Sequence, residues 1–187
     1  RADRPFYLSY HLPNLAWSAD TGEITGVEAL WEHLEVAVDV RADGLTVHVP
    51  RAAAGEMESG PADEPMPTAL YDEFLVQFED LFARYVRDGG RLAVEHIHNP
   101  PKTAADEPGR SFATDIGAYL RWIDAVGRSI GLDCPGPVGA MLDLGHARNN
   151  GGELDNLQPL GDWYATVGSR ILGYHIHQVD VDPAAAR

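Results

Sequence analysis

The sequence predicts an α/β fold in which strands and helices alternate around a parallel β-sheet. Five short apolar runs are typical of buried strands, stretches with helical periodicity separate them, and no hairpin signal joins any two of them. Of the 187 residues, 44% are hydrophobic, which is enough for one sizeable core. We therefore expect a single domain over residues 1–187, closed either as an open doubly wound sheet or as a (β/α)8 barrel. No Gly-x-Gly-x-x-Gly motif follows any strand, which removes the main support for a dinucleotide-binding fold.

The elements follow one another in a regular order along the chain. The predicted strands cover residues 6–11, 44–50, 91–98, 138–143 and 171–177. The predicted helices cover residues 27–38, 70–85, 116–130 and 157–168. Thr25 and Glu28 have the spacing of a capping box at the start of the first helix. Residues 51–67 and 101–110 are polar loops, of which the first is long enough to be a lid, and residues 149–152 form a turn.

Each of the five strands carries a metal-competent side chain at or near its C-terminal end. These residues are His11, His48, Glu95, Asp143 with His146, and His175 or His177. The C-terminal ends of the strands of a barrel converge on one mouth, which is where such enzymes place their chemistry. A lone histidine in a strand is usually a core or surface group, but an unpaired carboxylate such as Glu95 inside an apolar strand is costly. Together the five strand ends predict a functional site.

The most specific of these signals is the run that ends on Asp143, with His146 three residues later. A carboxylate and an imidazole at this spacing suit a divalent metal such as zinc or manganese. A simpler interpretation stays open for the pair in isolation. Asp143 can cap the segment that follows it, and His146 can bond a carbonyl group.

Composition narrows the choice of partners and location. The net charge is −15, from 14 Lys and Arg against 29 Asp and Glu. Such a surface repels phosphate backbones and disfavours a nucleic-acid partner. Cys134 is the one cysteine of the chain, so an intrachain disulfide is excluded and a reducing cytoplasm is expected. No apolar stretch approaches the length that spans a membrane.

Five segments of the chain resemble motifs of the xylose isomerase-like (β/α)8 barrel family, which includes sugar isomerases, sugar epimerases and endonuclease IV. Residues 10–15 (YHLPNL) and 46–50 (TVHVP) resemble its two histidine strands, and residues 142–147 (LDLGHA) are very similar to its Asp-x-x-His motif. Residues 94–96 (VEH) resemble its Glu-Asn pair, with His96 in place of asparagine, and residues 175–180 (HIHQVD) resemble its His-x-His-x-x-Asp strand.

The resemblance implies a (β/α)8 TIM barrel that is incomplete in this chain, with about five βα units of the eight that the fold needs. By analogy, about two units are missing before Arg1 and one after Arg187, and the last missing strand normally brings a second essential glutamate. An open arc leaves sheet edges and apolar faces uncovered. We therefore expect these residues alone to aggregate, to be molten or to pair with another chain, for instance as a homo-oligomer.

The resemblance also implies an enzyme that isomerises or epimerises a sugar or sugar phosphate by proton transfer next to a metal-polarised carbonyl. The implied ligands of the divalent ion (zinc or manganese, with magnesium or cobalt as alternatives) are Glu95, Asp143 and His177, with His175 as the alternative register. His146, His11 and His48 are further candidate ligands. Glu95 and His146 are the implied catalytic residues, for proton transfer and for positioning the substrate. Two alternatives stay open: a phosphodiesterase of the endonuclease IV kind, and an inactive binding protein of the same fold.

Overall fold

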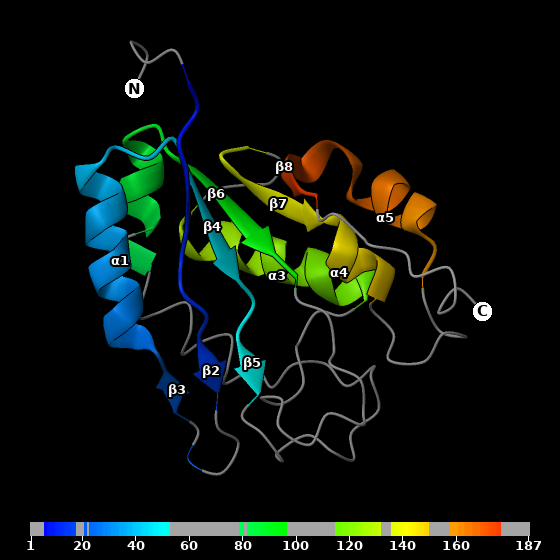
Figure 1. Cartoon of the computed structure of the whole chain (residues 1–187), viewed down its shortest axis with the longest axis horizontal. Helices are drawn as coiled ribbons and strands as arrows, with labels where there is room; N and C mark the ends of the chain where they lie inside the picture. Colours follow the sequence, from blue (N-terminus) through cyan, green and yellow to red (C-terminus); the bar gives the residue numbers. More distant parts are fainter. Residues whose placement is uncertain are drawn as a thin grey trace, which may run out of the picture.

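Five parallel strands form one sheet at the centre of the molecule (Figure 1). The computed structural model describes residues 6–17, 21, 23–52, 79–80, 82–96, 115–131, 136–149 and 158–176. The strands of the sheet are β1 (Ser9–His11), β4 (Gly44–His48), β6 (Arg91–Glu95), β7 (Val138–Asp143) and β8 (Ile171–His175). They lie side by side in chain order, and each neighbouring pair is parallel. A doubly wound sheet reverses its strand order at a switch point, and this sheet does not, so the incomplete (β/α)8 barrel is confirmed.

Helices lie between these strands, and all but α4 were predicted from the sequence. They are α1 (Val27–Asp39), α3 (Ile116–Ser129), α4 (Leu144–Asn149) and α5 (Leu160–Val167), and a 3-10 turn (Gly168–Arg170) follows α5. Of the helix predicted at 70–85, residues 79–80 and 82–85 are helical, as are residues 86–87, and the rest lies outside the described residues. In the described part of the chain, no helix is long and apolar enough to cross a membrane.

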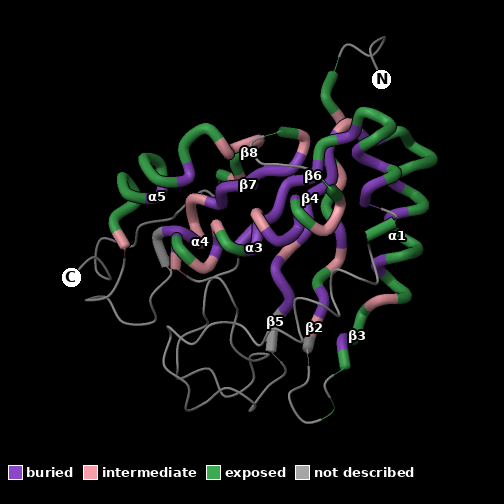
Figure 2. Tube along the Cα trace, turned by 180° about the vertical axis from the view of Figure 1, so that it is seen from behind, coloured by how far each residue is buried: buried purple, intermediate pink, exposed green. Residues whose placement is uncertain are grey.

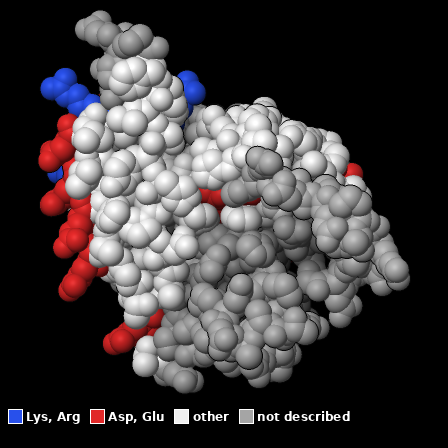
Figure 3. Space-filling model, viewed as in Figure 1, with Lys and Arg blue, Asp and Glu red and all other residues white. Residues whose placement is uncertain are grey.

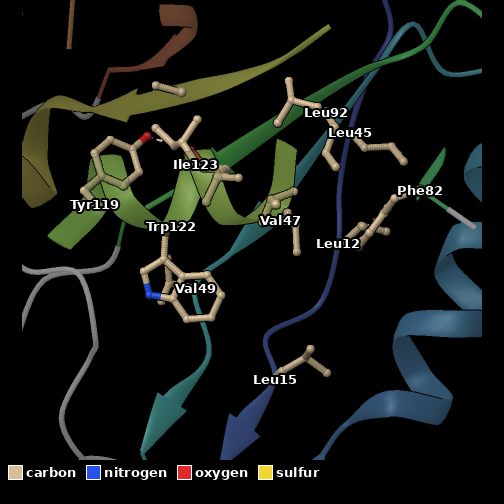
Figure 4. Close-up of a cluster of buried hydrophobic side chains, with 14 of the residues drawn as sticks. Leu12, Leu15, Leu45, Val47, Val49, Phe82, Leu92, Tyr119, Trp122 and Ile123 are labelled. Carbon is tan, nitrogen blue, oxygen red and sulfur yellow. Dashed lines mark hydrogen bonds between the residues drawn. The ribbon is translucent and has the colours of Figure 1, made fainter. Parts of the chain in front are cut away.

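The convex face of the sheet carries the hydrophobic core. Leu45 and Val47 of β4 and Leu92 and Val94 of β6 point to this face and are almost wholly buried. They belong to one cluster with the buried side chains of α1 and α3, part of which Figure 4 shows. Figure 2 shows the same division along α1, whose outer side is exposed and whose sheet side is buried. Burial of these apolar side chains is the main stabilising term of the fold.

The concave face carries polar, ionisable side chains, because the residues that alternate with the core residues along each strand point there. Strand register puts His48 beside Glu95, Glu95 beside Met141, and Asp143 beside His175 on this face. A hollow of about 300 Å³ extends along this face from Gly44 and Arg91, the first residues of β4 and β6, as far as His175. The chemistry predicted at the strand ends therefore lies on the face that the core does not use.

The predicted capping box is wrong. The N-cap of α1 is Gly26 rather than Thr25, and no side-chain hydrogen bond caps the helix. Gly26 has φ +91°, a left-handed conformation that glycine adopts without strain. The hydroxyl of Thr25 instead donates to the carbonyl oxygen of Ala16 at 3.4 Å.

A second, small sheet was not predicted from the sequence. Its strands are β2 (Ala16–Trp17), β3 (Ile24–Thr25) and β5 (Arg51–Ala52), and β2 pairs antiparallel with β3. This antiparallel pair lies outside the five predicted strands, none of which was expected to form a hairpin with another. Strands of two residues are too short to show any alternation of apolar and polar residues.

The turn predicted at 149–152 is wrong at its first residue, because Asn149 ends α4. Residues 150–152, most of the predicted lid and the 101–110 loop lie outside the described residues.

Gly139 of β7 gives a test of how closely β8 approaches. A Cβ atom at Gly139 would lie 2.3 Å from the carbonyl oxygen of Arg170 and 2.8 Å from Cγ of Leu172. We expect Gly139→Ala to lower the free energy of unfolding by ~1–3 kcal/mol, the usual cost of overpacking. Urea denaturation measures this change.

The control is Gly161→Ala on α5, where nothing lies within 4 Å of the added Cβ atom. Alanine favours a helix over glycine by up to ~1 kcal/mol, so the stability of this variant should stay equal or rise. If Gly139→Ala were as stable as Gly161→Ala, the close approach of β8 to β7 would be incorrect.

Candidate functional site

The carboxylate of Glu95, at the end of β6, lies at the centre of a group of histidine side chains. Only 1% of the Glu95 side chain is exposed. Imidazole nitrogens approach both oxygens: His11 Nε2 at 3.1 Å and His48 Nε2 at 3.4 Å from Oε2, and His175 Nδ1 at 2.9 Å and His146 Nδ1 at 3.7 Å from Oε1. Burial by itself raises the pKa of Glu95, but hydrogen bonds from His11, His48 and His175 outweigh it and hold this pKa well below its usual range.

Asp143, at the end of β7, supplies a second carboxylate. It is fully buried, and its Oδ2 lies 3.7 Å from His146 Nδ1 and 3.8 Å from His175 Nδ1. The described part of the chain thus brings together six of the predicted site residues: His11, His48, Glu95, Asp143, His146 and His175. His177, the preferred ligand on the last strand, lies outside the described residues.

His11 makes two hydrogen bonds that fix its protonation. Its Nδ1 lies 2.9 Å from the carbonyl oxygen of Leu12, which can only accept, so Nδ1 carries a hydrogen. Its Nε2 faces the Glu95 carboxylate, which also only accepts. Both nitrogens therefore carry hydrogens in this arrangement, and the hydrogen bond to Glu95 outweighs the effect of burial and raises the pKa of His11.

His146, in the first turn of α4, is held by two backbone contacts. Its N–H donates to Asp143 Oδ1 at 2.8 Å, and its Nδ1 lies 2.8 Å from the carbonyl oxygen of His96, to which it donates. The simpler interpretation of the Asp143 and His146 pair is therefore realised in the structure, since the acid caps the next segment and the imidazole bonds a carbonyl group. In the neutral ring, Nε2 is then left with a lone pair, as in many metal-ligating histidines whose other nitrogen is bonded.

No sequence pattern predicts the cluster of aromatic rings next to the site. His96 is fully buried, its ring stacks on Trp163 with centroids 4.5 Å apart, and Tyr119 lies 4.9 Å away. Within the described residues, neither ring nitrogen of His96 has a hydrogen-bond partner. Burial, assisted by repulsion from His146, lowers the pKa of His96 to about 3, so its ring stays neutral.

The donor set fits a divalent metal ion. Glu95 forms one possible ligand group with His11 and His175 and another with Asp143 and His146, and the ligand atoms of each group lie within 4.8 Å of one another. Ligands around a tetrahedral zinc ion are ~3.3 Å apart, given metal–ligand distances of about 2.0–2.2 Å. The separations from Glu95 to His11 and His175 are close to this value. Buried carboxylates and imidazoles together suit zinc or manganese.

The contact between Glu95 and His11 can be tested in the metal-free protein. We expect Glu95→Gln to lower the pKa of His11, because the hydrogen bond to Glu95 is the largest cause of its raised pKa. Protonated His11 stabilises the wild-type fold fully below its unfolded pKa of about 6.5. That stabilisation is lost as the pH rises through the raised pKa of His11 in the folded protein. In Glu95→Gln this pH-dependent decrease in the free energy of unfolding should be absent.

An NMR titration of the His11 ring protons measures the change. Glu35→Gln, on the exposed side of α1, is the matched control and should leave the pKa of His11 as it is. An unaltered pKa in Glu95→Gln would show that the two side chains are not in contact.

Comparisons with known proteins agree with this architecture. No protein-family model and no curated protein matches the chain. Among solved structures, it is similar to a provisionally named xylose isomerase from Rhodospirillum rubrum, with a TM-score of 0.59 and 18% identity over 93% of this chain and 51% of that chain. A D-tagatose 3-epimerase-like protein aligns with a TM-score of 0.48 and 18% identity over 95% of this chain and 58% of that chain. The chain spans about half the length of the solved structures it matches. Over that span its fold is that of part of a (β/α)8 barrel.

Proposed function

We propose that this protein is a divalent-metal-dependent isomerase or epimerase of a sugar or sugar phosphate. The observation that carries the proposal is the buried Glu95 carboxylate at the C-terminal edge of the sheet, with imidazoles from other strands around it and Asp143 beside it. That edge is where (β/α)8 barrels hold their active sites. The proposed ligands are Glu95, Asp143 and a histidine at the end of the last strand, either His175 or His177.

A divalent cation held by these residues would polarise a sugar carbonyl and the hydroxyl next to it. The low pKa of Glu95 suits a ligand, which has to be ionised, and makes this residue a weak proton acceptor. His146 is better suited to the proton transfer, because its Nδ1 is bonded to a backbone carbonyl oxygen and its Nε2 keeps a lone pair.

The surface fits a small-molecule substrate better than a nucleic acid. Glu28, Glu32, Glu35 and Asp39 share one exposed face of α1, where Figure 3 shows a row of acidic side chains.

We further propose a single domain that works in the cytoplasm and that pairs its sheet edges, β1 and β8, with additional strands or with a second copy.

One observation favours the endonuclease IV-like alternative. His11 and His48 both direct Nε2 at the same oxygen of Glu95, and their rings lie 4.5 Å apart. Such a pair could hold a second metal ion, as in the phosphodiesterases with metal clusters. The net charge of −15 weighs against a DNA substrate.

The metal site is tested by titrating zinc and manganese into metal-free protein. We expect Glu95→Gln and Asp143→Asn each to weaken binding by ~100-fold or more, beyond the ~10–100-fold typical of losing an outer-shell partner. Glu35→Gln should bind as the wild type does. If all three variants bind equally, the ions lie elsewhere.

Proton transfer is tested by incubating the metal-loaded protein with a panel of ketoses and their phosphates in D2O. We expect deuterium at the carbon next to the carbonyl group, because that proton exchanges with solvent during isomerisation. His146→Asn should keep its metal and lose ~10²–10⁴-fold in rate, the usual contribution of an acid–base group. NMR of the sugars measures the deuterium incorporation and its rate.

An abasic-site DNA in the same assay separates the alternatives. Cleavage of the DNA without exchange in any sugar would favour the phosphodiesterase. Metal binding with neither activity would favour the binding protein.

A further inference from the structure

Tyr119 is a fully buried residue of α3 whose hydroxyl reaches two strands at once. The hydroxyl oxygen lies 2.6 Å from the carbonyl oxygen of Val94 in β6 and 3.0 Å from that of Met141 in β7. Figure 4 shows the ring on α3, with the hydroxyl directed at the strands. One hydrogen is therefore shared between neighbouring strands. Burial, together with the charge of Glu95, raises the pKa of Tyr119 well above its usual value, so the hydroxyl stays a donor.

This contact lies where the pairing of β6 and β7 ends. The last paired residues of the two strands are Glu95 and Met141. Val94 comes directly before Glu95, and Met141 comes two residues before Asp143. Glu95 is thus the last residue of β6 in this ladder, and Asp143 lies two residues beyond the last paired residue of β7. The separation of the two carboxylates therefore depends also on what else connects the strand ends. The Tyr119 hydroxyl makes such a connection.

We propose that Tyr119 is a positioning residue for the candidate metal centre, and that its hydroxyl ties the ends of β6 and β7 and so sets the spacing of Glu95 and Asp143. This inference rests on the proposed function, because spacing matters to two carboxylates that hold one ion. Tyr119 itself touches neither carboxylate through an identified contact. It acts through the backbone, from the opposite face of the sheet.

Tyr85 offers a matched control. It is also buried, and its hydroxyl also donates to a backbone carbonyl oxygen, that of Ala42 at 2.9 Å. Ala42 lies before β4, at the opposite end of the strands from the histidine cluster. Tyr119→Phe and Tyr85→Phe each remove one buried hydroxyl, so they should lower the thermal midpoint by similar amounts. Only Tyr119→Phe should alter the strand ends.

The experiment compares the wild type, both variants and Glu95→Gln in two measurements on the whole chain. We expect zinc to bind Tyr119→Phe ~10–100-fold more weakly than the wild type, the usual effect of losing an outer-shell contact, and Tyr85→Phe as tightly as the wild type. In the metal-free protein, we expect the amides of Glu95, His96 and Leu142 to exchange their hydrogens about tenfold faster in Tyr119→Phe only, because local opening becomes easier. Replacing Tyr119 with para-aminophenylalanine, which keeps a donor at the same place, should restore both.

Each outcome decides between the alternatives. If Tyr119→Phe binds zinc as the wild type does and its strand ends exchange as in Tyr85→Phe, Tyr119 is only a core residue and the proposal is wrong. If the wild type itself binds no zinc, the proposed metal function fails, and hydrogen exchange alone decides whether Tyr119 ties the strands. If Tyr119→Phe does not fold, the para-aminophenylalanine protein decides, since wild-type zinc binding and exchange support the tie and failure of either overturns it.

Discussion

The structure around the candidate site depends on keeping one carboxylate, that of Glu95, charged inside the protein. Taking an isolated carboxylate out of water is very costly, and such a group normally takes up a proton instead. Here the surrounding imidazoles reverse that tendency and hold the pKa of Glu95 low. Because those imidazoles come from β1, β4, β8 and α4, the charge is stable only if all these elements are in place. The site and the strand register therefore depend on each other.

The two faces of the sheet divide stability from chemistry. The convex face is apolar and packs with α1 and α3, so it supplies the hydrophobic free energy that holds the strands. The concave face carries Glu95, Asp143 and the histidines at its C-terminal edge, and it contributes little apolar burial there. Side chains alternate between the faces of a strand, so β4 and β6 can serve both purposes with a single run of residues.

Backbone carbonyl groups just after the strands set the orientation and the Nδ1 protonation of two of the imidazole rings. Leu12 accepts a hydrogen bond from Nδ1 of His11, and His96 accepts one from Nδ1 of His146. In the neutral His146 ring the hydrogen on Nδ1 leaves the lone pair on Nε2, which is the effect of an outer-shell partner at a metal site. In His11 the same kind of contact turns Nε2, which also carries a hydrogen, toward Glu95. The loops therefore contribute to the site through their main-chain carbonyl groups, and a sequence motif, which lists only residue types, does not show this contribution.

The alternation of strands and helices can be predicted from the sequence alone, since apolar runs such as 138–143 and amphipathic stretches such as 116–130 carry their own periodicity. The sequence also placed Glu95, Asp143 and the histidines at or near the C-terminal ends of the strands and so identified them as candidates, although three strands end earlier than predicted, at His48, Glu95 and His175. It could not determine strand order, which excluded the doubly wound sheet, because pairing between distant segments leaves no local pattern. For the same reason, only the tertiary structure shows that His11, His48 and His175 all face the carboxylate of Glu95. The position of His175 depends on the pairing of β8 with β7, which shifts by a bulge at Ala140 and Met141. Tyr119 has the apolar spacing of any core residue of α3, and its hydroxyl gains a role only because packing carries it to the ends of two strands.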